Sequence, residues 1–396
     1  MGMKRYLVGG ALRDLLLGVL PREHDVAFEG SVAEFIQAYP HTRKVGRTVD
    51  VYLVDGVEHM PVRGGSITHD LALRDLTINA LAMDEAGVLH AHPQALDDLA
   101  QGVLRAAYPD AFRDDPTRLF RVARFAARFP DFSVAPETLA LMRQAAAQGL
   151  AASLPAERVA NEVRKALVCP APSRFVRILA EAGCLMPWFA ELAGADAIPA
   201  GPARYHSGSV LEHIGNVMDR CAGDDLAVWM ALCHDLGKCT TPPHVLPRHI
   251  GHELRGAEAA LQLGQRLGMP NLFIAAGEVG ARLHMKGGTY PALRPGTRVD
   301  MLDELHRKGL MRPFWRLVEA DFGLASKHGD APAATLHATA ATTAMAHAAG
   351  ARSAMAQRDL DAMLGVSLPP EWRNLGAASG EHLRVLRCKA LCAAEV

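Results

Sequence analysis

The sequence of 396 residues predicts an α+β fold, with a mixed β-sheet near the N-terminus followed by helical units. Up to about residue 105, short β-like runs such as Tyr6–Val8 and Val26–Phe28 alternate with helical segments. Beyond it, the chain is rich in Ala, Leu and Arg at helical spacing and has few strand signals. These patterns divide the chain into an α+β head, a helical neck, a helical body and a helical tail: residues 1–105, 106–170, 171–330 and 331–396.

Local signals place individual elements and boundaries. A helix is expected over 11–17, and Asp55-Gly56 between two apolar runs predicts a β-hairpin, because this dipeptide favours tight primed turns. Pro170, Pro172 and the Pro- and Gly-containing stretch 198–202 punctuate the helical part and indicate boundaries between units.

Composition excludes several classes of protein. A hydrophobic content of 49% is too high for a disordered chain. No run approaches the roughly 20 apolar residues needed to span a bilayer, and no secretion signal is recognised. The seven cysteines lack CxxC spacing, which favours reduced thiols in the cytoplasm. The net charge of −1 does not by itself indicate nucleic-acid binding, but residues 105–165 hold ten basic against seven acidic side chains.

The most informative segment begins at Gly9-Gly10. A strand that enters two glycines and then a helix lets the backbone approach a phosphate, and the N–H groups at the start of the helix face it. Arg13 lies on the first turn of this helix. Glu23 and Asp25, two residues apart at the start of a strand, project to the same face and suit Mg²⁺ ions for nucleotidyl transfer.

Three blocks in this order, residues 9–25, 74–82 and 114–125, resemble the class II tRNA nucleotidyltransferases and the related poly(A) polymerases. The resemblance covers residue 4 to about 325 and implies template-independent addition of CCA, from CTP and ATP, to the 3′ end of tRNA. It implies that Glu23 and Asp25 hold Mg²⁺ and that Glu58 is a third acidic group. Five residues would contact the incoming nucleotide: Gly10, Arg13, Arg74, Arg121 and Arg124.

Base selection is implied for Asp115 and Arg118, which match the family's amino-acid template. A carboxylate accepts from the exocyclic amine that cytosine and adenine share, whereas uracil and guanine would leave a buried charge unpaired. Arg118, Arg121 and Arg124 recur every three residues and so follow one face of a helix. Guanidinium groups suit phosphates and base edges, although a solvated basic face is the simpler alternative.

Two features depart from the family pattern. The family has Asp where this chain has Glu23, and the longer side chain would alter metal geometry. The segment Arg63–Asp70 is much shorter than the flexible loop of full-length relatives, which helps their active site switch from C to A addition. The short segment suggests a variant that adds only the two cytidines.

A second constellation surrounds the doublet His234-Asp235, which is predicted to lie inside an apolar helical stretch. Its order of His and Asp residues resembles an HD-type phosphohydrolase domain, here placed within 171–330. The resemblance implies 2′,3′-cyclic phosphodiesterase, 2′-nucleotidase and phosphatase activities. Imidazole and carboxylate ligands suit Ni²⁺ or another divalent transition metal. The expected ligands are His213, His234, Asp235 and Asp321.

Four further residues have open roles in this module. His249 or His252, together with His284, would contact phosphate or a second metal. Lys238 is either a phosphate contact or a structural helix end. Alternative readings of the whole chain are a phosphohydrolase with a decayed transferase head, a catalytically silent tRNA-binding protein and a poly(A) polymerase. The expected assembly is a monomer or a homodimer.

Overall fold

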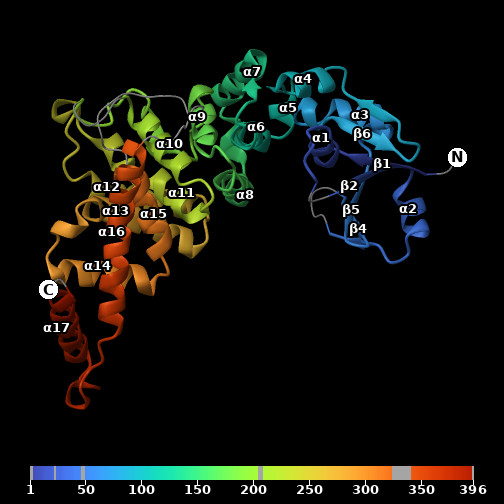
Figure 1. Cartoon of the computed structure of the whole chain (residues 1–396). Helices are drawn as coiled ribbons and strands as arrows, with labels where there is room; N and C mark the ends of the chain where they lie inside the picture. The colour runs from blue at the N-terminus through green and yellow to red at the C-terminus, as the bar shows by residue number, and fades with distance from the viewer. Residues whose placement is uncertain (1–2, 22–23, 46–49, 204–207, 323–339, 395–396) are drawn as a thin grey trace. The chain divides into compact units, whose positions relative to one another are not determined.

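The computed structural model describes residues 3–21, 24–45, 50–203, 208–322 and 340–394, without the side chains of 340–349 and 394 (Figure 1). The chain forms two compact units, the first comprising Met1–Pro155 with Ile178–Cys184, the second Ala156–Arg177 with Leu185–Val396. In the described part of the chain, no helix combines the length and apolar character that crossing a membrane requires. All seven cysteines are free thiols.

The first unit is built on a β-sheet that is mixed, as predicted, and has seven strands in the order β3-β4-β5-β2-β1-β6-β7. Its strands are β1 (Lys4–Val8), β2 (Asp25–Glu29), β3 (Arg43–Lys44), β4 (Tyr52–Val54), β5 (Val57–Pro61), β6 (Leu81–Asp84) and β7 (Leu89–Ala91). Strands β2 and β5 are parallel, and the other paired strands of this sheet run antiparallel. Because β1 and β2 lie in the middle of the sheet, residues at their ends are held by neighbours on both sides.

The predicted hairpin is present between β4 and β5, where Val54 pairs with Val57. Its turn residues Asp55 and Gly56 have φ angles of 49° and 83°, the left-handed region that a primed turn requires. The turn fixes the register of β5 and with it the position of Glu58.

Helices cover the sheet and continue the first unit. They are α1 (Gly10–Leu16), α2 (Val32–Ala38), α3 (Ile67–Ala72), α4 (Ala95–Gln101), α5 (Ala111–Asp114), α6 (Thr117–Arg128) and α7 (Pro136–Ala147). A second, two-stranded parallel sheet joins β8 (Val103–Leu104) to β9 (Ser133–Val134). Short 3₁₀ helices lie at Arg63–Gly65, Thr77–Asn79 and Leu150–Ser153. Phe28 and Phe35 stack at 4.2 Å in the core between β2 and α2.

The second unit is helical. Its helices are α8 (Ala156–Leu167), α10 (Val210–Arg220), α11 (Asp225–Cys233), α12 (His252–Arg266), α13 (Asn271–Gly288), α14 (Pro295–Arg307), α15 (Met311–Phe322), α16 (Ala340–Leu364) and α17 (Ala377–Ala394). Helix α9 (Ser173–Glu181) contains the residues at which the chain passes between the two units. Short 3₁₀ helices lie at Ala190–Leu192, Leu236–Thr240, Pro243–Val245, Tyr290–Ala292 and Pro370–Trp372.

Helix α11 forms the centre of this unit and is buried from Ala227 to Cys233. Glycines of α13 allow its close packing, since a Cβ at Gly280 would lie 3.0 Å from Met230 Cβ. The helix ends at Cys233, so His234-Asp235 follows the apolar helix rather than lying inside it, which corrects the prediction. The His234-Asp235 doublet therefore lies at the C-terminal end of the buried helix α11.

Candidate active sites

The first candidate site lies where β1, β2 and β5 come together. Asp25 pairs with Glu58 on the parallel strand β5 and with Val8 on the antiparallel strand β1. Partners on adjacent strands are about 4.8 Å apart and point to the same face of a sheet. Asp25 and Glu58 therefore form a neighbouring acidic pair. Glu23 lies outside the described residues.

The glycine turn follows β1 directly. Gly9 has a φ of 68°, and its N–H donates to Leu81 O over 2.9 Å. A Cβ added at Gly9 would lie 3.7 Å from Arg74 Nη1, and one at Gly10 would lie 3.4 Å from Arg13 Nη2. The turn thus lies against two guanidinium groups and beside Asp25, the arrangement expected for binding a polyphosphate next to metal-binding carboxylates.

Arg13 is buried beneath this turn, with 3% of its surface exposed. Its Nε and Nη2 donate to Asp14 Oδ1 over 3.0 and 2.7 Å, and Nη1 donates to Asn79. Its guanidinium also lies 5.2 Å from the ring centres of Phe125 and Phe129. These contacts fix α1 against α6, so contact of Arg13 with a phosphate stays a prediction.

Two further arginines of the predicted site are paired with aspartates. Arg74 donates to Asp70 Oδ2 through Nε and Nη2, over 2.9 and 2.6 Å. Arg121 Nε and Nη2 lie 2.7 and 2.6 Å from Asp75 Oδ2. Burial alone would raise the pKa of Asp75, but Arg121 and hydrogen bonds from Asn79 and from the Leu76 N–H hold it well below its usual range. Asp75 is therefore an ionised internal anchor for Arg121.

The predicted base-reading residues lie at the start of α6. Asp115 Oδ1 accepts from the Thr117 N–H over 3.1 Å. Arg118 is buried, and donates to Leu73 O over 2.9 Å and to Tyr108 Oη over 2.8 Å. Arg124, also buried, lies over the ring of Phe125 at 4.3 Å. These arginines are individually held rather than forming a solvated basic face.

Sequence reasoning missed the residues that hold these arginines. Asp14, Asp70, Asp75 and Asn79 accept hydrogen bonds from the predicted arginines, and Tyr108 accepts from Arg118. Asp14, Asp75 and Asn79 lie within the recognised blocks, which was the available signal. The four-residue spacing of Asp70 and Arg74 was an available signal, whereas nothing in the spacing of Tyr108 indicated its partner.

The second candidate site lies in the helical unit, where three histidines share one local arrangement. The Nδ1 atoms of His234, His252 and His284 lie 2.7, 2.6 and 2.8 Å from the backbone oxygens of Ala231, His249 and Ala281, each three residues earlier. Because a carbonyl only accepts, these Nδ1 atoms carry the proton. Each Nε2 is then left with a lone pair, the tautomer that metal-binding histidines adopt.

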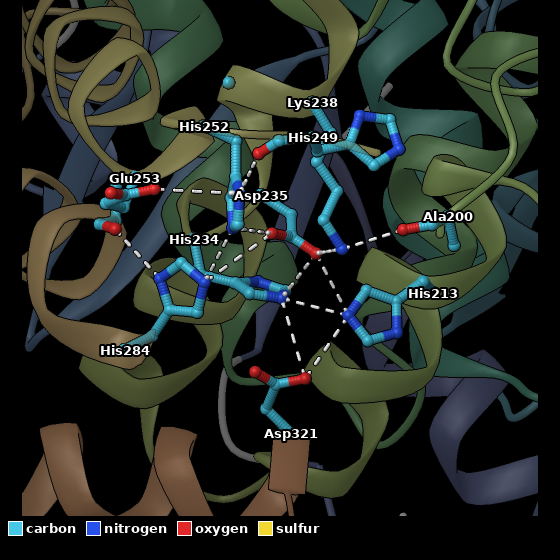
Figure 2. Close-up of polar contacts among 12 residues, drawn as sticks. Ala200, His213, His234, Asp235, Lys238, His249, His252, Glu253, His284 and Asp321 are labelled. Atoms are coloured by element: carbon cyan, nitrogen blue, oxygen red, sulfur yellow. Dashed lines mark hydrogen bonds and ion pairs between the residues drawn. The ribbon is translucent and has the colours of Figure 1, made fainter. Parts of the chain in front are cut away.

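These Nε2 atoms converge on the carboxylate of Asp235, which is 1% exposed (Figure 2). On one side, Asp235 Oδ2 lies 3.1 Å from His213 Nε2 and 3.2 Å from His234 Nε2. Asp321 Oδ1 completes this group at 3.3 Å from His213 Nε2. All four predicted metal ligands are thus brought together, from α10, the end of α11 and α15.

On the other side of the same carboxylate, Asp235 Oδ1 lies 3.3 Å from His252 Nε2 and 3.7 Å from His284 Nε2. The two imidazole Nε2 atoms lie 3.2 Å apart. Two lone pairs at this distance repel unless a proton or a metal ion lies between them, and two nitrogens bound tetrahedrally to one metal would be about 3.3 Å apart. Of the two alternatives left open for partnering His284, His252 is the one in contact.

Burial and neighbouring charges shift the pKa values of the histidines and of Asp235. Burial lowers the pKa of His284 to about 4, which keeps this imidazole neutral and able to bind a metal. Burial alone would also lower the pKa of His213, but the hydrogen bonds that it donates to Asp235 and Asp321 raise it to about 9. Against the cost of burial, nearby His and Lys side chains hold the pKa of Asp235 well below its usual range.

Lys238 and His249 differ in their relation to this site. Lys238 Nζ lies 2.7 Å from Asp235 Oδ2 and donates to Ala200 O over 2.9 Å, so it belongs to the cluster. His249 instead contacts Pro199 O and Thr241 Oγ1 through its two nitrogens, each at 2.8 Å. Gly237 allows the close approach of α12, because a Cβ there would lie 2.0 Å from His252 O.

Comparison with known families matches two segments of the chain that follow the seven-stranded sheet. Residues 131–195 match the family described as "Probable RNA and SrmB-binding site of polymerase A". Residues 204–308 match the HD domain family, which includes His213, the His234-Asp235 doublet, His252 and His284. The fold and the two sites therefore define a nucleotidyltransferase that also carries an HD domain.

Curated relatives identify the family. The multifunctional CCA protein of Halorhodospira halophila is 36% identical over 81% of this chain and 83% of its own length. That of Alkalilimnicola ehrlichii is 38% identical over 81% and 84%. The chain belongs to the multifunctional CCA protein family.

Solved structures share the fold at low sequence identity. The Thermotoga maritima CCA-adding enzyme complexed with tRNA has a TM-score of 0.59 and 20% identity, over 98% of this chain and 87% of that one. The Bacillus stearothermophilus CCA-adding enzyme in complex with CTP has a TM-score of 0.60 and 22% identity, over 99% and 89%.

Proposed function

We propose that this protein adds nucleotides of the CCA sequence to the 3′ end of tRNA in the cytoplasm, using CTP and ATP. The observation that carries the proposal is the pairing of Asp25 with Glu58 beside the Gly9-Gly10 turn. Carboxylates adjacent to a phosphate-binding turn are what nucleotidyl transfer requires. Family membership and the names of the relatives that bind tRNA or CTP support the same reaction.

The residues fit Mg²⁺ because carboxylate oxygens are the hard ligands that this ion prefers. Glu23 and Asp25 would hold it, with Glu58 as the adjacent acid, and bound Mg²⁺ would supply charge neutralisation on the triphosphate and activation of the attacking hydroxyl. Gly9 and Gly10 let the triphosphate approach the start of α1. Arg74, fixed by Asp70, contributes a guanidinium next to this turn.

Base selection is assigned to Asp115 and Arg118. The Asp115 carboxylate would accept from the exocyclic amine of cytosine or adenine, while Arg118 would donate to ring acceptors. The other contacts of Arg118, to Leu73 O and Tyr108 Oη, hold its guanidinium in one place. Because Arg118 is held in one position, a base that leaves the charges of Asp115 and Arg118 unpaired would be rejected.

The segment Arg63–Asp70, which is shorter than the family's loop, is held in place by hydrogen bonds. Arg63 Nε donates to Asp70 Oδ1 over 2.7 Å, and Nη1 donates to Leu73 O over 2.9 Å. Ser66 caps α3 by accepting from the His69 N–H over 3.3 Å. This anchoring supports the hypothesis that the enzyme adds CC only, because a tied segment is poorly suited to moving the site from C to A addition.

One assay tests both levels of this proposal. A tRNA transcript that ends before CCA is incubated with Mg²⁺ and with CTP, ATP or both, and the products are sized. Extension by two residues supports the CC-only form, and extension by three rejects it while confirming CCA addition. A long homopolymer made from ATP indicates a poly(A) polymerase. No extension, with the HD domain active, indicates a decayed head. No extension and no hydrolysis indicate a catalytically silent tRNA-binding protein.

We also propose that the HD domain is a metal-dependent phosphohydrolase acting on phosphate esters such as those at RNA 3′ ends. The supporting observation is the convergence of His213, His234 and Asp321 on the buried Asp235. These ligands suit Ni²⁺ or a similar transition metal, which would supply an activated water and polarise the phosphate. Lys238, which is paired with the same carboxylate, would neutralise a bound phosphate.

The Asp235 Oδ1, His252 and His284 group supports a second metal ion in the same domain, which these three residues would hold. Hydrolysis of 2′,3′-cyclic AMP, 2′-AMP and p-nitrophenyl phosphate is measured after loading chelator-treated protein with Ni²⁺, Mn²⁺, Co²⁺ or Mg²⁺. Activity restored by a transition metal supports the proposal. Absence of hydrolysis with every metal, in a folded protein, rejects it.

A further inference from the structure

His249 differs from the other buried histidines of the helical unit in the nitrogen that carries its proton. Its Nε2 lies 2.8 Å from Pro199 O. Because a carbonyl only accepts, this Nε2 is protonated whether the ring is neutral or charged. In His234, His252 and His284 it is Nδ1 that lies against a backbone oxygen, which leaves Nε2 free for a metal. His249 therefore cannot bind a metal through Nε2, as those three histidines would.

A threonine fixes the orientation of the His249 ring. Thr241 Oγ1 lies 2.8 Å from His249 Nδ1, and Arg255 Nη2 donates to the same hydroxyl oxygen over 3.3 Å. Thr241 and His249 are both buried, and hydrogen bonds in such a low-dielectric interior are stronger than in water. Both nitrogens of the imidazole are thus engaged, and the N–H at Nε2 is directed to Pro199 O.

Pro199 belongs to a short segment, 198–200, that is held at two successive carbonyls. His249 donates to the first, and Lys238 Nζ donates to the second, Ala200 O, over 2.9 Å. Lys238 Nζ also lies 2.7 Å from Asp235 Oδ2, as Figure 2 shows. The segment lies between the two stretches matched by known families, 131–195 and 204–308. It is therefore the part of the chain that leads into the HD domain.

The same segment fixes the start of α10. The Val210 N–H donates to Ile198 O over 2.8 Å, and Pro199 forms an antiparallel bridge with Ser209. The side chain of Ser209 caps α10, and the His213 N–H donates to Ser209 O over 3.0 Å. The position of His213 therefore depends on where the segment 198–200 is held.

We propose that His249 is a positioning residue for the metal ligand His213, acting through Pro199 and the start of α10. The inference rests on the metal site proposed for the HD domain. Asp235 is held to this segment by Lys238 on one side, and His213 follows the segment on the other. The contact of His249 with Pro199 O thus helps to set the 3.1 Å separation of His213 Nε2 and Asp235 Oδ2. Groups that orient metal ligands typically change metal affinity by about ten- to a hundred-fold when they are removed.

The test compares His249→Leu with His249→Gln in the full chain. Leucine removes both hydrogen bonds of the ring, whereas the amide of glutamine can donate to Pro199 O from a position close to that of Nε2. We expect His249→Leu to weaken Ni²⁺ binding about ten-fold in competition with a chelator, and His249→Gln to keep most of the affinity. His244→Leu, at an exposed position outside the cluster, is the matched control.

A double-mutant cycle with His213→Ala separates positioning from a general loss of structure. Once His213 is absent, His249→Leu should cause no further loss of Ni²⁺ affinity, because the remaining group of Asp235, His252 and His284 does not include a residue of α10. An equal loss in both backgrounds would overturn the proposal, since it would show that His249 stabilises the domain as a whole.

Hydrogen exchange of the metal-free protein gives a measurement that does not depend on the proposed hydrolase. The Val210 and Leu211 N–H groups donate to Ile198 O and Ala195 O, so both should exchange faster in His249→Leu than in His244→Leu. If the wild-type protein binds no Ni²⁺, the proposed metal site fails, and this exchange still reports whether His249 holds the start of α10. Exchange equal to that of the control would overturn the proposal. CTP incorporation by the head and thermal unfolding report whether each variant is folded.

Discussion

The hydroxyl of Tyr108 joins Arg118 to Asp114. It accepts from Arg118 Nη1 over 2.8 Å and donates to Asp114 Oδ2 over 2.6 Å. The Arg118 guanidinium also lies 5.4 Å from the centre of the tyrosine ring. Tyr108 thus positions the arginine proposed to read the incoming base, through one hydrogen bond and one ring contact.

Tyr108→Phe keeps the ring contact and removes the hydrogen bond. A hydrogen bond to a charged group contributes about 1.5–3 kcal/mol, so a less restrained Arg118 should lower the preference for CTP over UTP about ten-fold. The measurement is the ratio of kcat/KM for the two nucleotides on a tRNA transcript lacking CCA. Tyr39→Phe, which removes a hydroxyl in contact with Arg5, is the matched control. A preference equal to that of the control contradicts this role for Tyr108.

Asp25 and Glu58 are expected to take part in nucleotidyl transfer and not in hydrolysis by the HD domain. Asp25→Asn should lower CTP incorporation by at least a hundred-fold, because an amide cannot replace the charge of a metal-binding carboxylate. Glu58→Gln should have a smaller effect in the same direction. Hydrolysis by the HD domain should be unchanged in both variants, since its ligands belong to the other unit. Full incorporation by Asp25→Asn would exclude this carboxylate from the transferase site.

The sequence predicted elements whose signals are local. The hairpin at Asp55-Gly56, the helix after Gly10 and the mixed character of the sheet are all confirmed. Strand order is not a local property, and the parallel pairing that brings Glu58 beside Asp25 joins segments more than thirty residues apart. For that reason the sequence named both acids without showing that they are neighbours.

The histidine site shows the same limit. The His234-Asp235 doublet was recognisable, but its position after α11 depends on where that buried helix ends. The sequence left open whether His249 or His252 accompanies His284. Packing of α12 against Gly237 determines that His252 accompanies His284. This contact places His252 beside Asp235, while His249 contacts Thr241 instead.

The two sides of Asp235 predict two metal ions. The wild-type protein, loaded with Ni²⁺ or Mn²⁺ and desalted, should hold two ions in the HD domain, and His284→Ala should hold one. Removing one ligand of three typically abolishes stable binding at that position, while His213, His234 and Asp321 remain. The measurement is metal content by mass spectrometry, without Mg²⁺.

His244 provides the control for this experiment, because it is an exposed histidine outside the cluster. His244→Ala should keep the full metal content. Asp235→Asn should lose both ions, because one carboxylate serves both groups. One ion in the wild-type protein, and the same content in His284→Ala, would rule out the second site.

Acid should destabilise the head through Asp75. Its pKa is lowered in the folded state by Arg121, so its contribution to stability is present above the pKa of an unfolded aspartate, about 3.9. That contribution is lost as the pH falls towards the lower, folded pKa. Asp75→Asn removes the charged partner of Arg121, whose side chain is 35% exposed, and should cost about 1.5–3 kcal/mol at neutral pH. Urea unfolding of the full chain from pH 7 to pH 3 measures the difference in the free energy of unfolding between the wild-type protein and Asp75→Asn.

This difference in the free energy of unfolding should shrink below pH 4. The wild-type carboxyl is then becoming protonated in the unfolded state, which removes the stabilisation that its charge provides. A difference that stays constant across this range would show that packing of Asp75, rather than its charge, stabilises the head.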